Sequence, residues 1–350
     1  MRKAVTGSTC KPSPVTSKIK PTSSKHSMTA IQYIHPTTGE SLIKTNEGLM
    51  ANGKLVFPYK NGAYRLVEDD NYTENFGYQW NKFVGTQVDK ASKLDISTVR
   101  FFAETGWDKE DLTDKNVLEV GSGAGRFSQV MLDSTKGILY SVDYSNAVEA
   151  NFKNNGPHDR LHLFQASIYE MPFVKGQFDK VFCLGVLQHT PDVEKSVQTL
   201  IEMAKPGAEV VVDFYPIRGW WTKLHAKYIF RPFTKKMSHE QLYKKIDRNI
   251  DWLIKAYRFF SKIGLGKIVN RFLPIVDIDG TLPKNLTPQQ LREWCVLDTF
   301  DMFSPQYDQP QRISTVVSWF KKYGMTDVWG GDIPYENCYA AVVKGKKGVN

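Results

Sequence analysis

Three glycines at alternate positions directly follow an apolar run that ends in Glu119 and Val120. They are Gly121, Gly123 and Gly125. Glycine lets the backbone turn sharply and lets a ligand approach it without meeting a Cβ atom. Asp143 lies twenty-two residues after the first of these glycines, at the end of a second apolar run over residues 138–142. A carboxylate about 20 residues beyond such a turn is placed to accept hydrogen bonds from ribose hydroxyls.

The spacing of these glycines separates two nucleotide-type ligands. Dinucleotide-binding folds use the pattern GxGxxG. This chain has GxGxG, and Arg126 stands where the last glycine of the longer pattern would fall. The ligand therefore need not be a pyrophosphate seated on a helix N-terminus. A glycine turn without any ligand is the alternative interpretation of the triplet taken alone.

Further apolar runs must form the elements that position these residues. Strands are expected over residues 161–165, 178–184 and 208–214. Asp192 is suited to cap a helix that runs to about Met203, and residues 205–207, Lys-Pro-Gly, end that helix. The last strand is almost entirely apolar, as expected for a parallel strand covered on both faces. Strands that alternate with helices predict a doubly wound α/β sheet.

Four segments of the chain resemble, in order and spacing, the motifs of class I S-adenosylmethionine-dependent methyltransferases of the type 11 group. They are the glycine loop 121–125, the strand end at Asp143, and residues 166–173 and 185–192. The resemblance covers about residues 113–215, and a helix near 313–323 with strands near 326–329 and 337–344 extends it to the chain end. It implies a Rossmann-like sheet of seven strands, the last one antiparallel, with a helical lid insertion at 216–310.

The resemblance also implies S-adenosylmethionine as cofactor and assigns residues to its methionine end. The backbone of the glycine loop would cradle that end, with contacts at Gly121, Gly123 and Gly125. Glu119 would either hold the amino group of the cofactor or stiffen the loop. The carbonyl groups near Leu184 and Gly185 would face the same amino group.

The ribose and adenine contacts are carried over in the same way. Asp143 would bind the ribose hydroxyls, and Tyr144 would pack on the adenine. Ser167 stands where relatives usually have an aspartate that binds the adenine amino group. A hydroxyl can accept that hydrogen bond, but without the charge of a carboxylate. Ile168 would cover the other face of the ring.

Methyl transfer to oxygen requires a base, because the acceptor hydroxyl must lose its proton. His189 is the best candidate, since it follows the fourth strand at the methyl end of the cofactor and imidazole titrates near neutral pH. The alternative is a structural role in the turn at residues 190–192. Gln188 is placed to orient the acceptor, and His225 and His239 are weaker candidates for the base. Further possible acceptor contacts lie in the segment 297–308, namely Asp298, Asp301 and Tyr307.

The chain divides into three parts by composition. Residues 1–30 are expected to be a disordered basic leader or a transit peptide, because residues 1–39 hold six Lys/Arg and no Asp or Glu. Residues 31–84 resemble a zinc-ribbon module that precedes such methyltransferases in bacteria. Its cysteine positions are occupied by His35, Thr38, Phe57 and Lys60. We therefore predict a degenerate ribbon without metal, followed by the methyltransferase domain at 85–350.

The cysteines and the apolar runs narrow the class of protein. None of the four cysteines forms a CxxC pair, which argues against a disulfide framework or a zinc cluster. No apolar run approaches the ~18 residues that would span a bilayer. These features favour a cytoplasmic protein, with a peripheral membrane or organelle location as the alternatives.

Residues 218–271 are basic and rich in aromatic side chains. They hold fourteen Lys/Arg and three acidic residues, a net charge of +11, whereas the whole chain carries +9. Three interpretations stand side by side: a solvated lid surface, an anionic acceptor, and docking on an anionic membrane through a basic amphipathic helix. Nucleic acid is disfavoured, because no recognition motif of a nucleic-acid module is present.

Together these features predict a methyltransferase that moves a methyl group from S-adenosylmethionine to a small-molecule or glycan-type acceptor, at oxygen. One alternative is a membrane-associated enzyme that acts on a lipid-linked substrate. Another is a non-catalytic regulator that binds the cofactor. A nicotinamide-dependent oxidoreductase is disfavoured by the missing third glycine of GxGxxG.

Overall fold

The computed structural model describes residues 30–349 apart from 69–70, 109 and 337, so almost all of the predicted leader 1–30 lies outside the described residues. Its centre is a parallel sheet. The strands of this part are β6 (Asn116–Val120), β7 (Ile138–Asp143), β8 (Leu161–Gln165), β9 (Phe178–Cys183) and β10 (Ala204–Phe214). Their order in the sheet is β8-β7-β6-β9-β10, so the order reverses beside β6. The glycine loop follows β6 at this switch point, where α/β folds bind their ligands.

An antiparallel hairpin completes this sheet. It consists of β11 (Met325–Tyr335) and β12 (Cys338–Lys347), and β12 pairs antiparallel with both β10 and β11. The predicted Rossmann-like sheet with its antiparallel strand is therefore confirmed, but the predicted number of seven strands is too small. The described chain adds five N-terminal strands, because β5 (Ala63–Arg65) pairs in parallel with β8 and extends the sheet at that edge.

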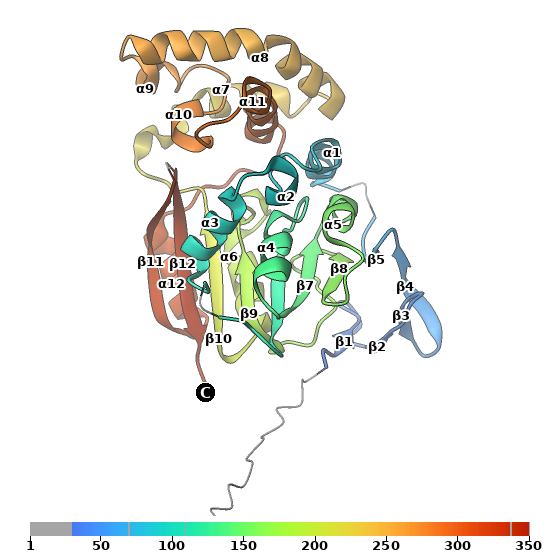
Figure 1. The fold of residues 1–350 in the computed structure, drawn as a ribbon. Helices are drawn as coiled ribbons and strands as arrows, with labels where there is room; N and C mark the ends of the chain where they lie inside the picture. Colours follow the sequence, from blue (N-terminus) through green and yellow to red (C-terminus); the bar gives the residue numbers. More distant parts are fainter. Residues whose placement is uncertain (1–29, 69–70, 109, 337, 350) are drawn as a thin grey trace, which may run out of the picture.

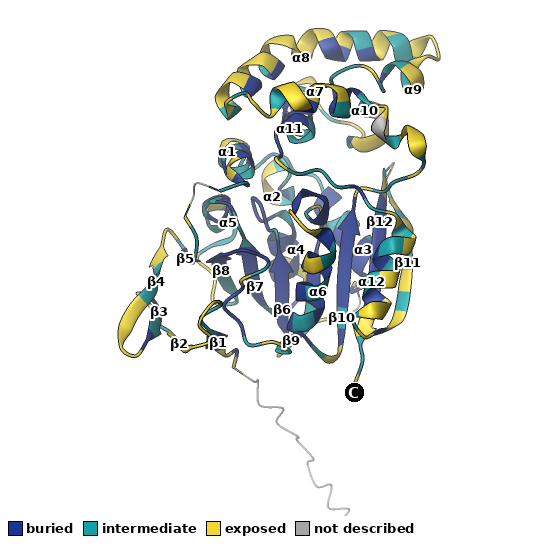
Figure 2. Ribbon diagram, turned by 180° about the vertical axis from the view of Figure 1, so that it is seen from behind, coloured by how far each residue is buried: buried dark blue, intermediate teal, exposed yellow. Residues whose placement is uncertain are grey.

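Helices cover both faces of the sheet (Figures 1 and 2). The side chains of successive strand residues point to opposite faces of the sheet, so neighbouring residues belong to different apolar clusters. Val117 packs in one apolar cluster with α3 (Ile96–Thr105) and α4 (Arg126–Ser134). Its neighbour Leu118 packs in another cluster with α6 (Val193–Met203) and α12 (Ile313–Lys322). α5 (Val148–Asn155) contacts α4 and β8. Asp192 caps α6 by accepting a hydrogen bond from the Lys195 amide.

The N-terminal strands form a meander beside the main sheet. They are β1 (Tyr33–Ile34), β2 (Ser41–Lys44), β3 (Gly48–Ala51) and β4 (Lys54–Lys60), followed by β5. His35, at a former cysteine position of the ribbon resemblance, packs on Phe57 and accepts hydrogen bonds from the amides of Thr37 and Thr38. Among the described residues, no group of three His, Cys, Asp or Glu side chains could hold a metal ion.

A layer of helices lies over the carboxyl ends of the parallel strands (Figure 1). It comprises α1 (Glu74–Lys82), α2 (Asp89–Ser92), η2 (Trp220–Lys223), α7 (Ala226–Thr234), α8 (His239–Lys262), α9 (Gly266–Val269), α10 (Ile278–Thr281) and α11 (Pro288–Phe303). α8 buries Leu242, Ile246 and Ile250 against Trp294 and Phe300 of α11, so this layer has its own apolar core. Within the described part of the chain, no helix is long and apolar enough to cross a membrane.

Candidate active site

A cavity of about 580 Å³ lies between the ends of the parallel strands and the helical layer. This volume is in the range of small-molecule binding sites. Most residues predicted to bind the cofactor line it, and so does the predicted base. The lining members are Gly121, Gly123, Asp143, Tyr144, Ile168, Leu184, Gly185 and His189. Glu119, Gly125 and Ser167 are not among its lining residues.

The glycine loop leaves no room for side chains. Gly121, Gly123 and Gly125 all have a φ angle between +52° and +83°, in the left-handed region that favours glycine. A Cβ atom on Gly121 would lie 2.1 Å from a methyl group of Val186, and one on Gly125 would lie 2.2 Å from Oδ1 of Asn151. Only bare backbone fits here, which suits a loop that holds a ligand by its amide groups.

Asp143 ties the end of β7 to this loop. Its Oδ2 accepts a hydrogen bond of 2.8 Å from the Gly123 amide. Its Oδ1 accepts two more, from the amide and the hydroxyl of Ser145, at 2.8 and 2.7 Å. Burial raises the pKa of this carboxyl, while the three donors oppose the shift. The carboxylate is therefore held in one orientation at the cavity wall, with acceptor capacity left for a ligand hydroxyl.

Glu119 lies beneath the glycine loop in a small polar network. Its Oε2 accepts hydrogen bonds from the hydroxyls of Ser128 and Ser141, and the amide of Asn151 donates to Ser128 at 2.8 Å. Burial raises the pKa of Glu119 to about 7, against the opposing effect of the two hydroxyl donors. The network joins β6, α4, β7 and α5 under the loop. This arrangement fits the stiffening role better than a direct contact with a ligand.

Replacing Glu119 by glutamine should stabilise the protein at pH 8 by about 2–3 kcal/mol. The folded-state pKa is about 7 and the ordinary value is 4.5. The folded chain therefore binds more protons than the unfolded chain between these values, and stability falls as pH rises through 7. Unfolding by urea at pH 5 and pH 8 measures the effect. The variant should lose less stability across this range than the wild type.

The exposed Asp111 provides the control for this measurement. It lies outside the polar network, and its pKa is lowered by Thr113 and Lys136. Asp111→Asn should leave the difference between pH 5 and pH 8 unchanged. Equal pH dependence in Glu119→Gln and the wild type would show that Glu119 is ionised throughout.

The predicted adenine end carries a row of aromatic rings. Tyr144 packs on Tyr72 with ring centroids 5.0 Å apart, and Tyr72 meets Tyr307 edge-on at 5.3 Å. Ile168 lines the cavity nearby. The hydroxyl of Ser167 accepts a hydrogen bond from the amide of Tyr169 at 3.2 Å, so it helps to shape its own turn.

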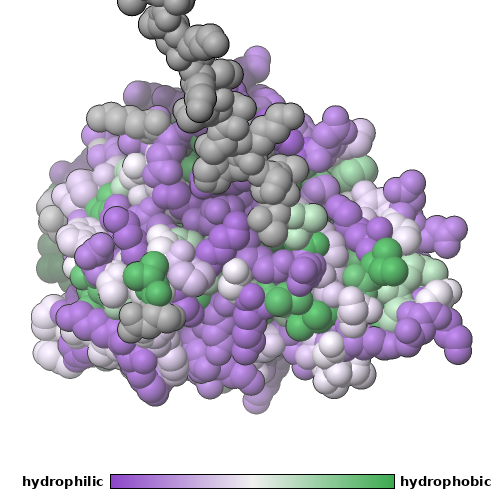
Figure 3. Space-filling view, turned by 90° about the horizontal axis from the view of Figure 1, so that it is seen from below, coloured by the Kyte–Doolittle hydropathy of each residue, from purple (hydrophilic) through white to green (hydrophobic). Residues whose placement is uncertain are grey.

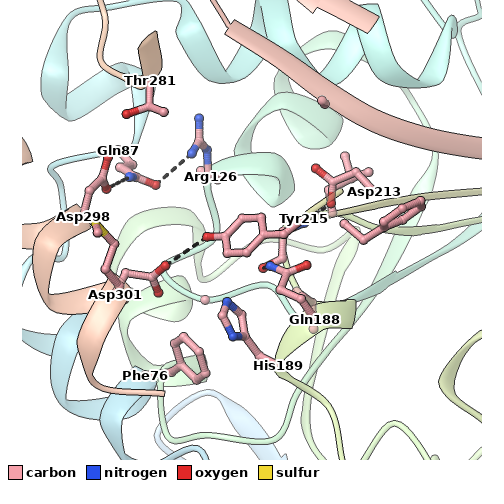
Figure 4. A pocket seen from close by; sticks show the side chains of 18 of the residues that line it. Phe76, Gln87, Arg126, Gln188, His189, Asp213, Tyr215, Thr281, Asp298 and Asp301 are labelled. Atoms are coloured by element: carbon pink, nitrogen blue, oxygen red, sulfur yellow. Dashed lines mark hydrogen bonds between the residues drawn. The ribbon is translucent and has the colours of Figure 1, made fainter. Parts of the chain in front are cut away.

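His189 also lines the cavity, in a buried aromatic setting (Figure 4). Its ring lies 5.1 Å from that of Phe76 and 5.6 Å from that of Tyr215. Its Nδ1 lies 3.1 Å from the carbonyl oxygen of Tyr307. A carbonyl oxygen can only accept, so Nδ1 carries the proton and Nε2 keeps its lone pair. Nε2 has no hydrogen-bond partner among the described residues. Burial lowers the pKa of His189, which keeps the ring neutral at pH 7.

The predicted acceptor half of the cavity, around Asp298 and Asp301, contains a chain of hydrogen bonds that local sequence does not indicate (Figure 4). Arg126 donates to Oε1 of Gln87 at 2.7 Å, and the Gln87 amide donates to Asp298 at 3.1 Å. Burial and the nearby Asp301 raise the pKa of Asp298 to about 7. Asp301 in turn accepts a hydrogen bond from the Tyr215 hydroxyl at 3.2 Å.

Of the other predicted acceptor contacts, Asp298, Asp301, Gln188 and His225 line the cavity. Tyr307 and His239 do not; Tyr307 reaches the site through its carbonyl bond to His189. Sequence reasoning missed Asp213, which lines the cavity and accepts hydrogen bonds from the Gly185 amide and from Arg100. The sequence could have indicated Asp213, because this residue lies near the end of an apolar parallel strand, at the same sheet edge as Asp143.

The fold and the cavity are consistent with a class I methyltransferase domain and with S-adenosylmethionine as its cofactor. Residues 118–212 match the family model described as "Methyltransferase domain". The residues present fit that cofactor, because the bare glycine loop and the carboxylate of Asp143 face one cavity of suitable size.

Curated relatives have different functions. The tRNA U34 carboxymethyltransferase of Nautilia profundicola is 32% identical over 168 residues, covering 47% of this chain and 49% of that protein. The sterol 4-C-methyltransferase strm-1 of Caenorhabditis elegans is 25% identical and covers 54% of each chain. The norajmaline N-methyltransferase of Rauvolfia serpentina is 26% identical, covering 45% of this chain and 55% of that protein. The chain thus spans about half the length of these relatives.

Proposed function

We propose that this protein transfers the methyl group of S-adenosylmethionine to a hydroxyl oxygen of a small-molecule or glycan-type acceptor. The observation that carries the proposal is the state of His189. Its tautomer is set by the Tyr307 carbonyl, its pKa is lowered, and its free Nε2 belongs to the same cavity wall as the glycine loop. A neutral imidazole with a free Nε2 can take the proton of an acceptor hydroxyl.

When bound, the cofactor supplies a methyl group that its sulfonium already activates. The chain's own task is then to hold the partners in line, which can supply several kcal/mol. We assign Asp143 to the ribose hydroxyls, Tyr144 and Ile168 to the adenine faces, and Ser167 to the adenine amino group. The glycine loop and the carbonyls of Leu184 and Gly185 would hold the methionine end. Glu119 would support the loop from below.

The acceptor half favours a polar acceptor with an anionic group. Arg126 lines the cavity and makes no ion pair with a carboxylate among the described residues. The only side chains there that hydrogen-bond to it are Ser97 and Gln87, both neutral, and its guanidinium also packs on the Phe127 ring. A guanidinium without a carboxylate partner is suited to bind a carboxylate or phosphate in two-point fashion. Asp298 and Asp301 also line the cavity and would accept hydrogen bonds from acceptor hydroxyls.

Transfer of an isotopically labelled methyl group tests this function. The protein is incubated with labelled S-adenosylmethionine and fractions of small molecules, glycans, lipids and RNA. Label should enter the small-molecule or glycan fraction as a methyl ether, which resists mild alkali. The relatives' names specify a tRNA, a sterol carbon and a nitrogen-type acceptor. Label in RNA, or on carbon or nitrogen, would therefore contradict the proposal.

A lipid-linked acceptor at a membrane surface is the second candidate. It is favoured by the large apolar side chains that the helical layer exposes beside its basic residues. In the same experiment this candidate predicts label in the lipid fraction.

A further inference from the structure

The turn from α8 into α9 exposes five large apolar side chains within fourteen residues. These residues, here named the α8–α9 corner, are Phe259, Ile263, Leu265, Ile268 and Phe272. Each is between 44% and 65% exposed. Single exposed apolar residues are ordinary, but a group of this kind at one corner marks a contact surface. In Figure 1 the corner lies at the left end of α8, where the chain turns into α9.

The solvent-facing side of α8 is basic along its length. Lys245, Arg248, Lys255 and Lys262 are exposed on it, and Trp252 lies among them at 63% exposed. None of these four cations forms an ion pair within the described part of the chain. We call this the basic face of α8.

The acidic residues of α8 lie on its flank and are already paired. Asp247 and Asp251 bind Arg292 of α11 at 2.9 and 3.2 Å, and Glu240 binds Lys244. The charges of α8 that have no ion-pair partner among the described residues are therefore all positive. The opposite end of the molecule differs, because its surface is mostly hydrophilic with separated apolar side chains (Figure 3).

We propose that the α8–α9 corner and the basic face of α8 dock this protein on an anionic lipid bilayer. The apolar corner would enter the headgroup region, while the lysine and arginine side chains would meet the lipid phosphates. Tryptophan is a side chain that favours this interface, which suits Trp252. The inference does not rest on the proposed function.

Other occupants fit this surface less well. A second copy of the chain would bring two basic faces together, and like charges repel. RNA-binding surfaces use aromatic rings on which bases stack. Three of the five corner residues are aliphatic and cannot stack in this way. Aliphatic side chains beside unpaired cations suit a lipid headgroup region, where acyl chains lie next to phosphates.

Docking would bring the cavity close to the bilayer. α8 packs directly on α11, and α11 supplies Trp294, Asp298 and Asp301 to the cavity wall. The cavity is thus separated from the docked surface by α8 and α11. A lipid-borne acceptor is not required for this arrangement, since a peripheral enzyme can act on any substrate near the membrane.

Co-sedimentation of the full chain with vesicles tests the proposal. The probes are vesicles of phosphatidylcholine alone and of phosphatidylcholine with phosphatidylserine at roughly three to one. Binding should require phosphatidylserine and should weaken as salt rises, because screening shortens the reach of surface charge. Absence of binding to both vesicle types, or equal binding to both at all salt concentrations, would overturn the proposal.

Two variants and one control locate the surface. Phe259→Ser/Ile263→Ser/Ile268→Ser removes the apolar corner, and Lys255→Glu/Lys262→Glu reverses part of the basic face. Each should reduce binding to the anionic vesicles by about tenfold or more. Ile43→Ser/Leu55→Ser removes two equally exposed apolar residues from β2 and β4, far from the lid, and should bind as the wild type does.

S-adenosylmethionine affinity, measured by calorimetry on each variant, shows that the variants are folded. Vesicle binding that persists in both α8 variants would contradict the assigned surface. Sedimentation velocity and an RNA-binding assay on the same proteins address the other occupants. A dimer or an RNA complex that the corner variant abolishes, without any vesicle binding, would assign the surface to that partner instead.

Discussion

Replacing Asp143 by alanine should weaken S-adenosylmethionine binding by about a hundredfold or more. Two ribose hydroxyls would each lose a hydrogen bond to a charged acceptor, and such bonds contribute roughly 1.5–3 kcal/mol. The loss is compounded because the Gly123 amide also donates to this carboxylate. Calorimetric titration of the variant measures the change. An unchanged affinity would remove Asp143 from the ribose site.

Ser145→Ala separates these two contributions. Ser145 donates its hydroxyl to Oδ1 of Asp143 but would not contact the ribose. This variant should therefore lose much less affinity than Asp143→Ala. Equal losses in both variants would mean that the orientation of the loop, not the ribose contact, determines binding.

Replacing His189 by asparagine should slow methyl transfer by about 10²–10⁴-fold and leave cofactor affinity unchanged. The asparagine amide can still donate to the Tyr307 carbonyl in place of Nδ1, so the local structure is retained. What the variant lacks is the free Nε2 that takes the proton. Phe76→Leu, which alters the ring packed on His189 but keeps the base, is the matched control. Full activity of His189→Asn would assign His189 to a structural role.

The pH dependence of the wild type gives an independent check on His189. A base must be unprotonated to act, and burial lowers the pKa of this histidine below its ordinary value of 6.5. Any decline in activity that protonation of His189 causes should therefore lie below pH 6.5, whereas protonation of Asp298 would act near pH 7. A decline that begins well above pH 6.5 would point to another group.

The central sheet and its glycine loop could be predicted because their signals are local. The apolar runs of β6 and β7, the alternate glycines and Asp143 lie within twenty-seven residues of one another. The N-terminal strands extend the sheet through pairing of Ala63 with Leu163, one hundred residues apart. No periodicity within either segment specifies that partner, so the strand number was underestimated.

The predicted acceptor half of the cavity also depends on contacts between residues that are far apart in the sequence. Gln87 bridges Arg126 and Asp298 across 39 and 211 residues of chain, and the Tyr307 carbonyl sets the tautomer of His189 across 118. Such contacts depend on how the helical layer packs, which local patterns do not encode. The inward face of α8 was predictable, since Leu242, Ile246 and Ile250 follow helical spacing.

Calorimetric titration of the wild type with S-adenosylmethionine, S-adenosylhomocysteine and NAD is the most direct test of the central claim. The glycine loop, Asp143 and the cavity they share predict micromolar binding of both sulfur compounds and no binding of NAD. Binding of NAD alone, or of none of the three, would contradict a methyltransferase cofactor site in this protein.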